Sequence, residues 1–313
     1  MDAGDLQARV IHKNVAELAV APHLDDYDAV RASFTWELAR GWLKQGNPVV
    51  AIELLQTARY NGMVNNLWTC GPLLKDVGQA KWAIDLTRGG YIMVHLDSLD
   101  PEVQRSMRSS YNPITTRDTL KGVELLLEMG KPATDIGNLL MLTSAQSIED
   151  VRETMTVLLD HYGMRTCLMS LKPVDEIGRL TPLLPRPEVV AEAYRIRDSL
   201  FLQGRSMGCQ DFPREYCGTT VFVSLDGKVS SCYSLRRNLG SVREHTLDDI
   251  VSASSSSLFF TGFRDHTDEV VSCSCNQELC WGCRANAYYF GGGTYQKDPF
   301  CDINTNAPRK TPY

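Results

Sequence analysis

The chain has 313 residues, of which 43% are hydrophobic and 22% are charged, and its net charge is −6 at pH 7. This length suits one large α/β domain, or a domain with a smaller satellite. Basic residues are scattered rather than grouped, so composition does not support nucleic-acid or membrane-surface binding as the main function. Apolar runs fall short of the ~20 residues that a membrane span needs.

The spacing of apolar residues predicts a helical N-terminal part. Val10, Val15 and Leu18 lie roughly on one helical face, and a second amphipathic stretch runs from Val30 to Trp42. We therefore expect residues 1–60 to be mainly helix.

Beyond residue 60, short apolar runs alternate with helical patterns. Strands are predicted at 64–69, 91–96, 136–142 and 164–171. Four helices are predicted between and after these strands. One starts at Asp100-Pro101, and the next has the apolar residues Leu120, Val123 and Leu127 before a C-cap at Gly130. The third starts with a capping box at Ser147–Asp150 and has the apolar stripe Val151, Met155, Leu158 and Leu159, and the fourth is marked by Val189, Ala193, Ile196 and Leu200. Such alternation indicates parallel strands with right-handed crossovers, which fits either an open barrel or a doubly wound sheet.

Eight of the ten cysteines cluster in the last third of the chain. The first group is Cys209, Cys217 and Cys232, the second is Cys273, Cys275, Cys280, Cys283 and Cys301, and only Cys70 and Cys167 are isolated. Eight thiols are what two four-thiolate metal sites require. The isolated pair is interpreted as small apolar side chains rather than ligands.

A β-hairpin is predicted within the first cysteine group. Residues 219–223 form a strand-like run, Asp226-Gly227 a turn, and residues 228–233 the return strand. This hairpin would place Cys232 roughly across from Val221, with Cys217 a short step beyond, so that two sulfurs converge on one metal site.

Three chemistries compete for these thiols. The first residues, MDAGDLQARVIHKN, contain no apolar core of a signal peptide, so we expect a cytoplasmic location with reduced thiols, which disfavours disulfides. Structural zinc and iron–sulfur clusters both accept four cysteines, and spacing alone does not separate them.

The cysteine-rich segment resembles a known family. Cys217, nine residues, Gly227, four residues and Cys232 match the opening of the SPASM domain, which lies at the C-terminus of many radical S-adenosylmethionine (SAM) enzymes. NLGSVREHTLDDI (238–250) and CWGCRANAYYFGGGTYQKDPFC (280–301) are similar to the segments that follow in that family.

The resemblance implies two auxiliary 4Fe–4S clusters. One would be held by Cys209, Cys217, Cys232 and Cys283, and the other by Cys273, Cys275, Cys280 and Cys301. The spacers between Cys273 and Cys283 are shorter than the family's usual pattern.

The middle of the chain is similar to the radical SAM barrel. WTCGPLL (68–74) resembles the end of the third strand, VHLDSLDPEVQRSMR (94–108) the fourth-strand signature, with His95 in place of the common Ser, and LKPVDEIGR (171–179) the end of the sixth strand. The resemblance implies a partial (β/α)6 TIM-like barrel that lacks its first strand or strands. It also implies contacts with SAM or substrate from Thr69, Gly71, His95, Asp97 and Ser98 at C-terminal strand ends.

The family's defining triplet, Cys-x3-Cys-x2-Cys, is missing from the 313 residues. Three thiolates leave one iron of a cluster open to chelate SAM, and no other residue type here replaces them. The chain begins Met1-Asp2-Ala3-Gly4, similar to the residues that follow the triplet in family members. We therefore expect either an N-terminally truncated radical SAM protein or a member that has lost its first strand.

Two functions follow as expectations, and the catalytic residues stay unknown. The first is a radical SAM/SPASM enzyme lineage that modifies a peptide or small metabolite, with an electron-donor protein as partner. The second is a non-catalytic iron–sulfur or zinc protein that uses the barrel as a binding surface. The expected organisation is a helical part at 1–60, the partial barrel at 61–205 and the SPASM domain at 206–313.

Overall fold

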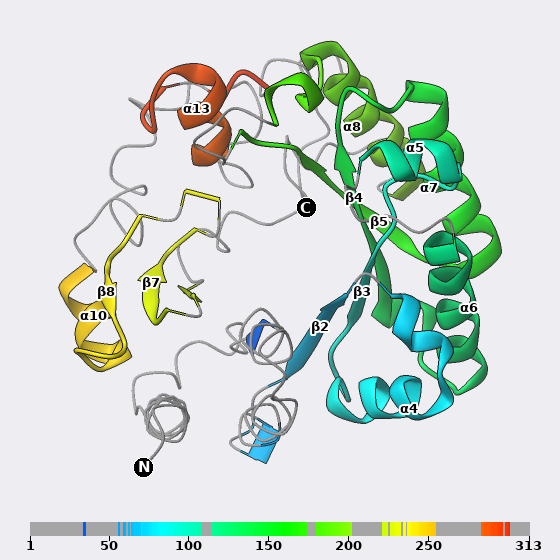
Figure 1. Cartoon of the computed structure of the whole chain (residues 1–313), viewed down its shortest axis with the longest axis horizontal. Helices are drawn as coiled ribbons and strands as arrows, with labels where there is room; N and C mark the ends of the chain where they lie inside the picture. Colours follow the sequence, from blue (N-terminus) through cyan, green and yellow to red (C-terminus); the bar gives the residue numbers. More distant parts are fainter. Residues whose placement is uncertain are drawn as a thin grey trace, which may run out of the picture. The chain divides into compact units, whose positions relative to one another are not determined.

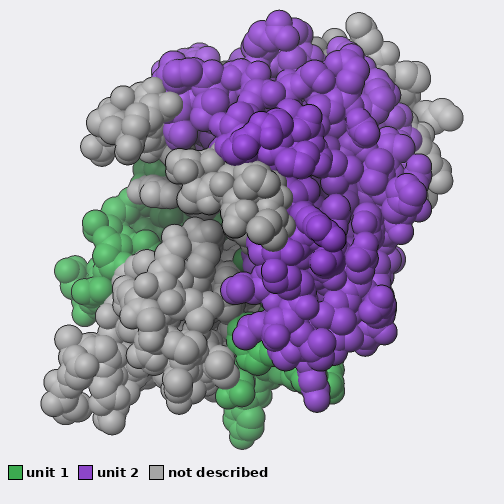
Figure 2. Space-filling view, turned by 45° about the vertical axis from the view of Figure 1, so that its right-hand side comes forward, with its two compact units in different colours: residues 1–68, 82–92, 215–263 green, residues 69–81, 93–214, 264–313 purple. Residues whose placement is uncertain are grey.

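The computed structural model describes residues 34–35, 56, 59–60, 62, 64–69, 71–107, 114–173, 180–201, 221–224, 226–232, 234–235, 237–254, 283–296 and 298–300. They belong to two compact units, one comprising residues 1–68, 82–92 and 215–263, and the other residues 69–81, 93–214 and 264–313 (Figure 2). The expected boundaries near residues 60 and 205 stay predictions. Among the described residues, no helix is both long and apolar enough to cross a membrane.

The main sheet has five strands in the order in which they occur along the chain (Figure 1). They are β1 (Phe34–Thr35), β2 (Asn65–Thr69), β3 (Ile92–His95), β4 (Ile136–Leu142) and β5 (Arg165–Ser170). β1 pairs with β2 in parallel, and β4 pairs with β5 in parallel, with Gly137 opposite Arg165. Neighbouring strands that follow one another in chain order are typical of a barrel, whereas in a doubly wound sheet the strand order reverses at a switch point. The expected partial TIM-like barrel is confirmed.

The connecting helices are α4 (Val77–Leu86), α5 (Pro101–Ser106), α6 (Ile114–Glu128), α7 (Ile148–Tyr162) and α8 (Pro187–Phe201), with 3-10 turns η1 (Pro72–Lys75), η2 (Ala133–Asp135) and η3 (Thr181–Leu183). In Figure 1, α6, α7 and α8 lie on one side of β4 and β5. The other face of these strands is thereby left for the side chains that line a barrel interior.

The predicted caps are present. Asp100 accepts a hydrogen bond from the Glu102 amide at the start of α5, and Ser147 accepts one from the Asp150 amide at the start of α7. Val151, Met155 and Leu158 on α7 are fully buried, as the stripe predicted, whereas Leu159 of the same stripe is half-buried.

Two helix predictions need correction. Phe34 and Thr35 form β1, so the helix expected from Val30 to Trp42 is wrong at these residues. Pairing with β2, about 30 positions away, overrides the local pattern. On α6, Val123 and Leu126 are buried, whereas the expected Leu120 and Leu127 are only half-buried, so the core face is rotated from the one predicted.

A second, antiparallel sheet contains β6 (Phe222–Val223), β7 (Lys228–Ser230) and β8 (Gly240–Ser241). Val223 pairs with Val229, which confirms the predicted hairpin, although its strands are shorter than expected. Extending this register places Ser231, one residue before Cys232, opposite Val221. The turn glycine, Gly227, has a φ of 83°, which an L side chain rarely adopts.

The small sheet packs on the helix α10 (Leu247–Ser254) through a core of its own. Its buried residues are Val229, Val242 and Ile250, surrounded by Val221, Val223, Leu239 and Leu247. A final helix, α13 (Arg284–Gly291), begins directly after Cys283 and belongs to the unit that contains β4 and β5.

Candidate functional site

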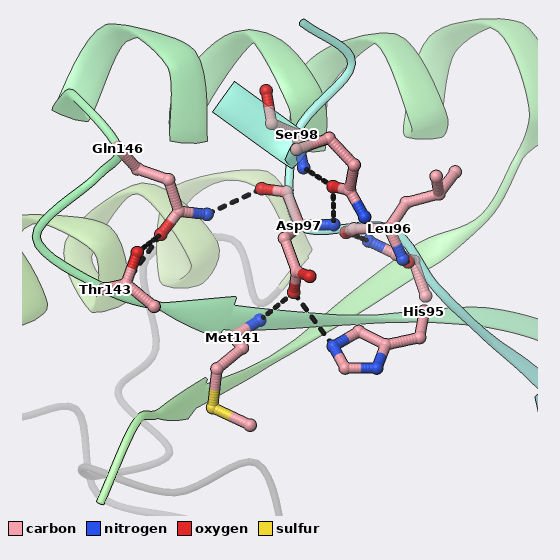
Figure 3. A network of polar contacts seen from close by, with 9 residues as sticks. His95, Leu96, Asp97, Ser98, Met141, Thr143 and Gln146 are labelled. Carbon is pink, nitrogen blue, oxygen red and sulfur yellow. Dashed lines mark hydrogen bonds and ion pairs between the residues drawn. The ribbon is translucent and has the colours of Figure 1, made fainter. Parts of the chain in front are cut away.

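The C-terminal end of β3 brings His95 and Asp97 together. The Asp97 carboxylate accepts a hydrogen bond from His95 Nε2 at 2.9 Å and from the Met141 amide of β4 at 2.8 Å (Figure 3). The Asp97 side chain is 3% exposed and that of His95 is 29% exposed. Because a carboxylate only accepts, Nε2 is the nitrogen that carries the proton in this hydrogen bond. The strand end thus offers a partly exposed, oriented imidazole.

Side-chain amides fix the backbone around this pair. Gln104 Oε1 accepts from the Asp97 and Ser98 amides at 2.9 Å each, and Gln146 Nε2 donates to the Asp97 carbonyl at 2.6 Å. Asn138 on β4 makes two hydrogen bonds of 2.9 Å to the Leu96 backbone. The sequence reading missed Asn138 and Gln146, whose partners are 42 and 49 positions away. It did not single out Gln104 either, although its partners are only 6 and 7 positions away, within the quoted segment 94–108.

Ser98 is fully buried, and its hydroxyl is bonded to α7. Its Oγ donates to Asp150 at 2.5 Å and accepts from the Asp100 amide at 2.9 Å. Burial raises the pKa of Asp150 above its ordinary value, although the Ser98 hydrogen bond acts in the opposite direction. Within the described residues, the second carboxylate oxygen of Asp150 is buried without a hydrogen-bond partner.

At the end of β2, Thr69 and Gly71 form a tight turn into η1. The Gly71 amide donates to Thr69 Oγ1 at 3.1 Å. Gly71 has a φ of 88°, and a Cβ added there would lie 2.5 Å from Thr119 Cγ2 of α6. Only glycine satisfies both the backbone conformation and this close approach. The turn holds the Thr69 hydroxyl at the strand end.

The end of β5 carries a buried lysine that the sequence reading did not single out. Lys172 is 8% exposed, and its Nζ donates to the Ser170 carbonyl at 3.2 Å. A buried ammonium group suits an anionic partner. Residues 174–179 of the predicted sixth-strand motif lie outside the described part of the chain.

Of the predicted cluster ligands, Cys232 and Cys283 are described, whereas Cys209, Cys217, Cys273, Cys275, Cys280 and Cys301 lie outside the described residues, as does the isolated Cys70. Cys232 follows β7 and is half-buried, and Ser230 Oγ donates to its carbonyl at 3.3 Å. Cys167 lies in β5 opposite Leu139, as its strand position predicted. Among the described residues, no group of three or more His, Cys, Asp or Glu side chains could hold a metal ion.

Cys283 is the N-cap residue of α13, and its Sγ accepts from the Asn286 amide at 3.4 Å. Its own amide donates to Asp298 Oδ2 at 2.6 Å. Asp298 Oδ1 accepts from the Phe300 amide at 2.9 Å, and Oδ2 also accepts from Asn286 Nδ2 at 3.3 Å. A thiolate at a helix N-terminus with an N–H donor is a suitable ligand for an electron-rich iron–sulfur cluster. The sequence reading missed Asn286 and Asp298, although both lie within the quoted closing segment.

These features define a class of protein. A parallel-strand α/β barrel that resembles radical SAM enzymes occurs with a small antiparallel sheet in the SPASM region. Residues 215–284 match the family model of the SPASM iron–sulfur cluster-binding domain. The resemblance to radical SAM proteins with a C-terminal SPASM domain is therefore confirmed, by the family model for this segment and by the fold for the barrel.

The chain is similar to several solved structures. Native anSMEcpe with bound AdoMet (S-adenosylmethionine) has a TM-score of 0.64 and 16% identity, covering 94% of this chain and 85% of that chain. Native anSMEcpe with AdoMet and the Cp18Cys peptide has a TM-score of 0.63 and 15% identity, covering 94% and 86%. SuiB of Streptococcus suis bound to S-adenosylmethionine has a TM-score of 0.54 and 15% identity, covering 85% and 69%. At these identities, the likeness shows the fold alone. No curated protein matches the sequence.

Proposed function

We propose that the chain is an iron–sulfur protein of the radical SAM/SPASM type that binds two auxiliary 4Fe–4S clusters. The observation that carries the proposal is the buried Cys283 sulfur at the N-terminus of α13, within reach of the Asn286 amide. Helix N-termini and N–H donors stabilise the negative charge of a thiolate–cluster unit.

In this proposal the eight clustered cysteines hold the clusters. Cys209, Cys217, Cys232 and Cys283 hold one, and Cys273, Cys275, Cys280 and Cys301 hold the other. When bound, such clusters supply one-electron transfer. The barrel's strand ends bind the adenosyl ligand.

Thr69, Gly71, His95, Asp97 and Ser98 form or support the SAM-binding strand ends. His95 is the direct contact, because its ring is partly exposed and oriented by Asp97. The buried Ser98 acts through the backbone. Lys172 would bind an anionic group such as a carboxylate.

The complete protein would modify a peptide or a small metabolite by 5′-deoxyadenosyl radical chemistry in the cytoplasm, with an electron-donor protein as partner. A solved structure of anSMEcpe contains AdoMet together with a peptide, and this supports a peptide as the first substrate class to test.

The test is anaerobic reconstitution of the 313-residue chain, followed by iron and sulfide analysis. The wild-type chain should bind about eight irons, and Cys283→Ser about four. Cys167→Ser is the matched control and should bind as much iron as the wild type, because Cys167 lies within strand β5, opposite Leu139, and is not one of the eight clustered cysteines. A colourless protein that carries two zinc ions would contradict the proposal.

A second candidate is a non-catalytic iron–sulfur or zinc protein that uses the barrel as a binding surface. The absence of Cys-x3-Cys-x2-Cys from the 313 residues favours it for this chain. AdoMet binding and cleavage should be measured separately. Binding without 5′-deoxyadenosine formation would favour the second candidate, and steady 5′-deoxyadenosine formation would favour the enzyme.

A further inference from the structure

A hydrogen-bonded path of side chains connects the last residue of β5 with Cys283. Ser170 Oγ donates to Asn286 Oδ1 at 3.3 Å, and the amide of the same asparagine side chain donates to Asp298 at 3.3 Å. The Asn286 backbone amide donates to Cys283 Sγ. One residue therefore contacts the barrel strand, the carboxylate and the sulfur.

Burial makes this path rigid. Ser170, Asn286 and Asp298 are 3%, 2% and 1% exposed. The orientation of the Asn286 amide follows from chemistry: the carboxylate accepts, so Nδ2 faces Asp298 and Oδ1 faces the Ser170 hydroxyl. Rotating this side chain would break both contacts in a place that water does not reach.

Arg284 closes the loop that carries Asp298. Its Nη1 donates to the Thr294 carbonyl at 3.1 Å and to the Gln296 carbonyl at 3.0 Å. The loop after α13 is thus tied back to the first residue of the helix, and Asp298 meets the Cys283 amide. The Asp298 carboxylate and the Cys283 sulfur are therefore both positioned by hydrogen bonds from Cys283 and Asn286.

We propose that Asn286 is a positioning residue that links the Cys283 sulfur to the C-terminal end of β5, and that it thereby tunes the reduction potential of the cluster held by Cys283. The inference rests on the proposed function, because it needs a cluster at Cys283. N–H donors to cluster sulfurs and nearby charges are main determinants of iron–sulfur potentials. A change at Ser170 in the barrel should therefore be detectable at the cluster.

The test uses the full chain, reconstituted anaerobically, with iron content and an EPR-monitored redox titration as readouts. In Ser170→Ala the iron content should stay at the wild-type level, but the midpoint potential should become more negative, because the Asn286 backbone N–H is held less firmly against the sulfur. Asn286→Ala keeps this backbone N–H but removes both side-chain contacts that position it, so it should shift the potential further in the same direction. Asp298→Asn should shift it to more positive values, because removing a negative charge favours the reduced cluster.

Ser199→Ala is the control, since Ser199 Oγ donates to a carbonyl within α8. It should leave the potential unchanged. Ser170→Ala with full iron content and an unshifted potential would overturn the inference and leave the proposed function intact. A wild-type chain that takes up no iron would overturn both. Ser170→Ala keeps the test decisive if Asn286→Ala does not fold, because it removes a single hydroxyl from the barrel side.

Discussion

Buried aspartates hold two regions of this protein in different ways. At the end of β3, Asp97 joins two neighbouring strands through the Met141 amide and orients His95. At the start of α13, Asp298 gathers the Cys283 and Phe300 amides and the Asn286 side chain. The first carboxylate reinforces strands that other hydrogen bonds also hold. The second organises a loop whose described residues belong to no strand. An aspartate thus orients a side chain on strands that are already paired in one region, whereas in the other region it holds the backbone of the site together.

The largest expected effect is at Asp298. Asp298→Ala removes the acceptor of three N–H donors in a buried place, and each unsatisfied donor costs about 1–3 kcal/mol. We expect the free energy of unfolding of the apo chain to fall by about 3–5 kcal/mol and iron uptake to drop to about half. Urea denaturation and iron analysis measure these changes.

Asp85→Ala is the control for this variant, because its side chain is 54% exposed and forms a 3.5 Å pair with the exposed side chain of Arg88. It should stay within about 0.5 kcal/mol of the wild type. If Asp298→Ala matches this control in stability and iron content, the loop does not depend on its carboxylate.

A smaller loss of stability is expected at Asp97. Asp97→Ala should cost about 2 kcal/mol, because Asn138 and Gln146 still anchor the strand end. AdoMet affinity should fall about tenfold, through loss of the orientation of His95. Calorimetric titration with AdoMet and urea denaturation measure the two effects.

His95→Ala separates binding from stability. With 29% of its side chain exposed, His95 should contribute less than about 0.5 kcal/mol to the free energy of unfolding, while AdoMet affinity falls as in Asp97→Ala. Unchanged AdoMet affinity in His95→Ala would remove this residue from the proposed site.

Asp150 contacts Ser98, at the same strand end, from α7. Replacing it should raise the free energy of unfolding, whereas replacing Asp97 lowers it. The folded-state pKa of Asp150 is raised by burial, so its contribution to stability is largest below the unfolded pKa and is lost as pH rises through the folded value. Asp150→Asn should stabilise the chain at pH 7 by less than about 1 kcal/mol, because the amide oxygen still accepts from Ser98. Urea denaturation at pH 7 and pH 4 checks this, and the difference between variant and wild type should shrink at pH 4.

The sequence predicted best those features that depend on near neighbours. The caps at Asp100 and Ser147 and the strand at Ile136–Leu142 follow from residues a few positions apart, and the structure confirms them. The strand at Phe34–Thr35 was missed because its pairing with β2 is not encoded locally.

Site prediction followed the same rule. The resemblance of residues 94–108 to the family's fourth-strand signature singled out His95 and Asp97, and the structure brings these two side chains together. Asn138 and Gln146 act on β3 from more than 40 positions away, and Ser170 meets Asn286 across 116 positions. Such contacts are decided by the packing of strands and helices, so a single sequence does not reveal them.

The smallest effect is expected at an exposed aspartate of the hairpin, Asp226. Hydrogen bonds from Lys228, which is 2.8 Å away, and from Ser224 lower the pKa of Asp226 to about 2. A depressed carboxyl pKa stabilises the folded state above the unfolded pKa of about 3.9, and this stabilisation is lost as pH falls through about 2.

Because the Asp226 and Lys228 side chains are 52% and 62% exposed, solvent screens the ion pair, and it should contribute less than about 1 kcal/mol to the free energy of unfolding. A double-mutant cycle with Asp226→Asn and Lys228→Met at pH 6 measures the coupling energy, which should shrink in 1 M salt and at pH 3. A coupling energy above about 2 kcal/mol that persists in salt would show that this exposed carboxylate acts like the buried ones, and the contrast between buried and exposed aspartates would then fail.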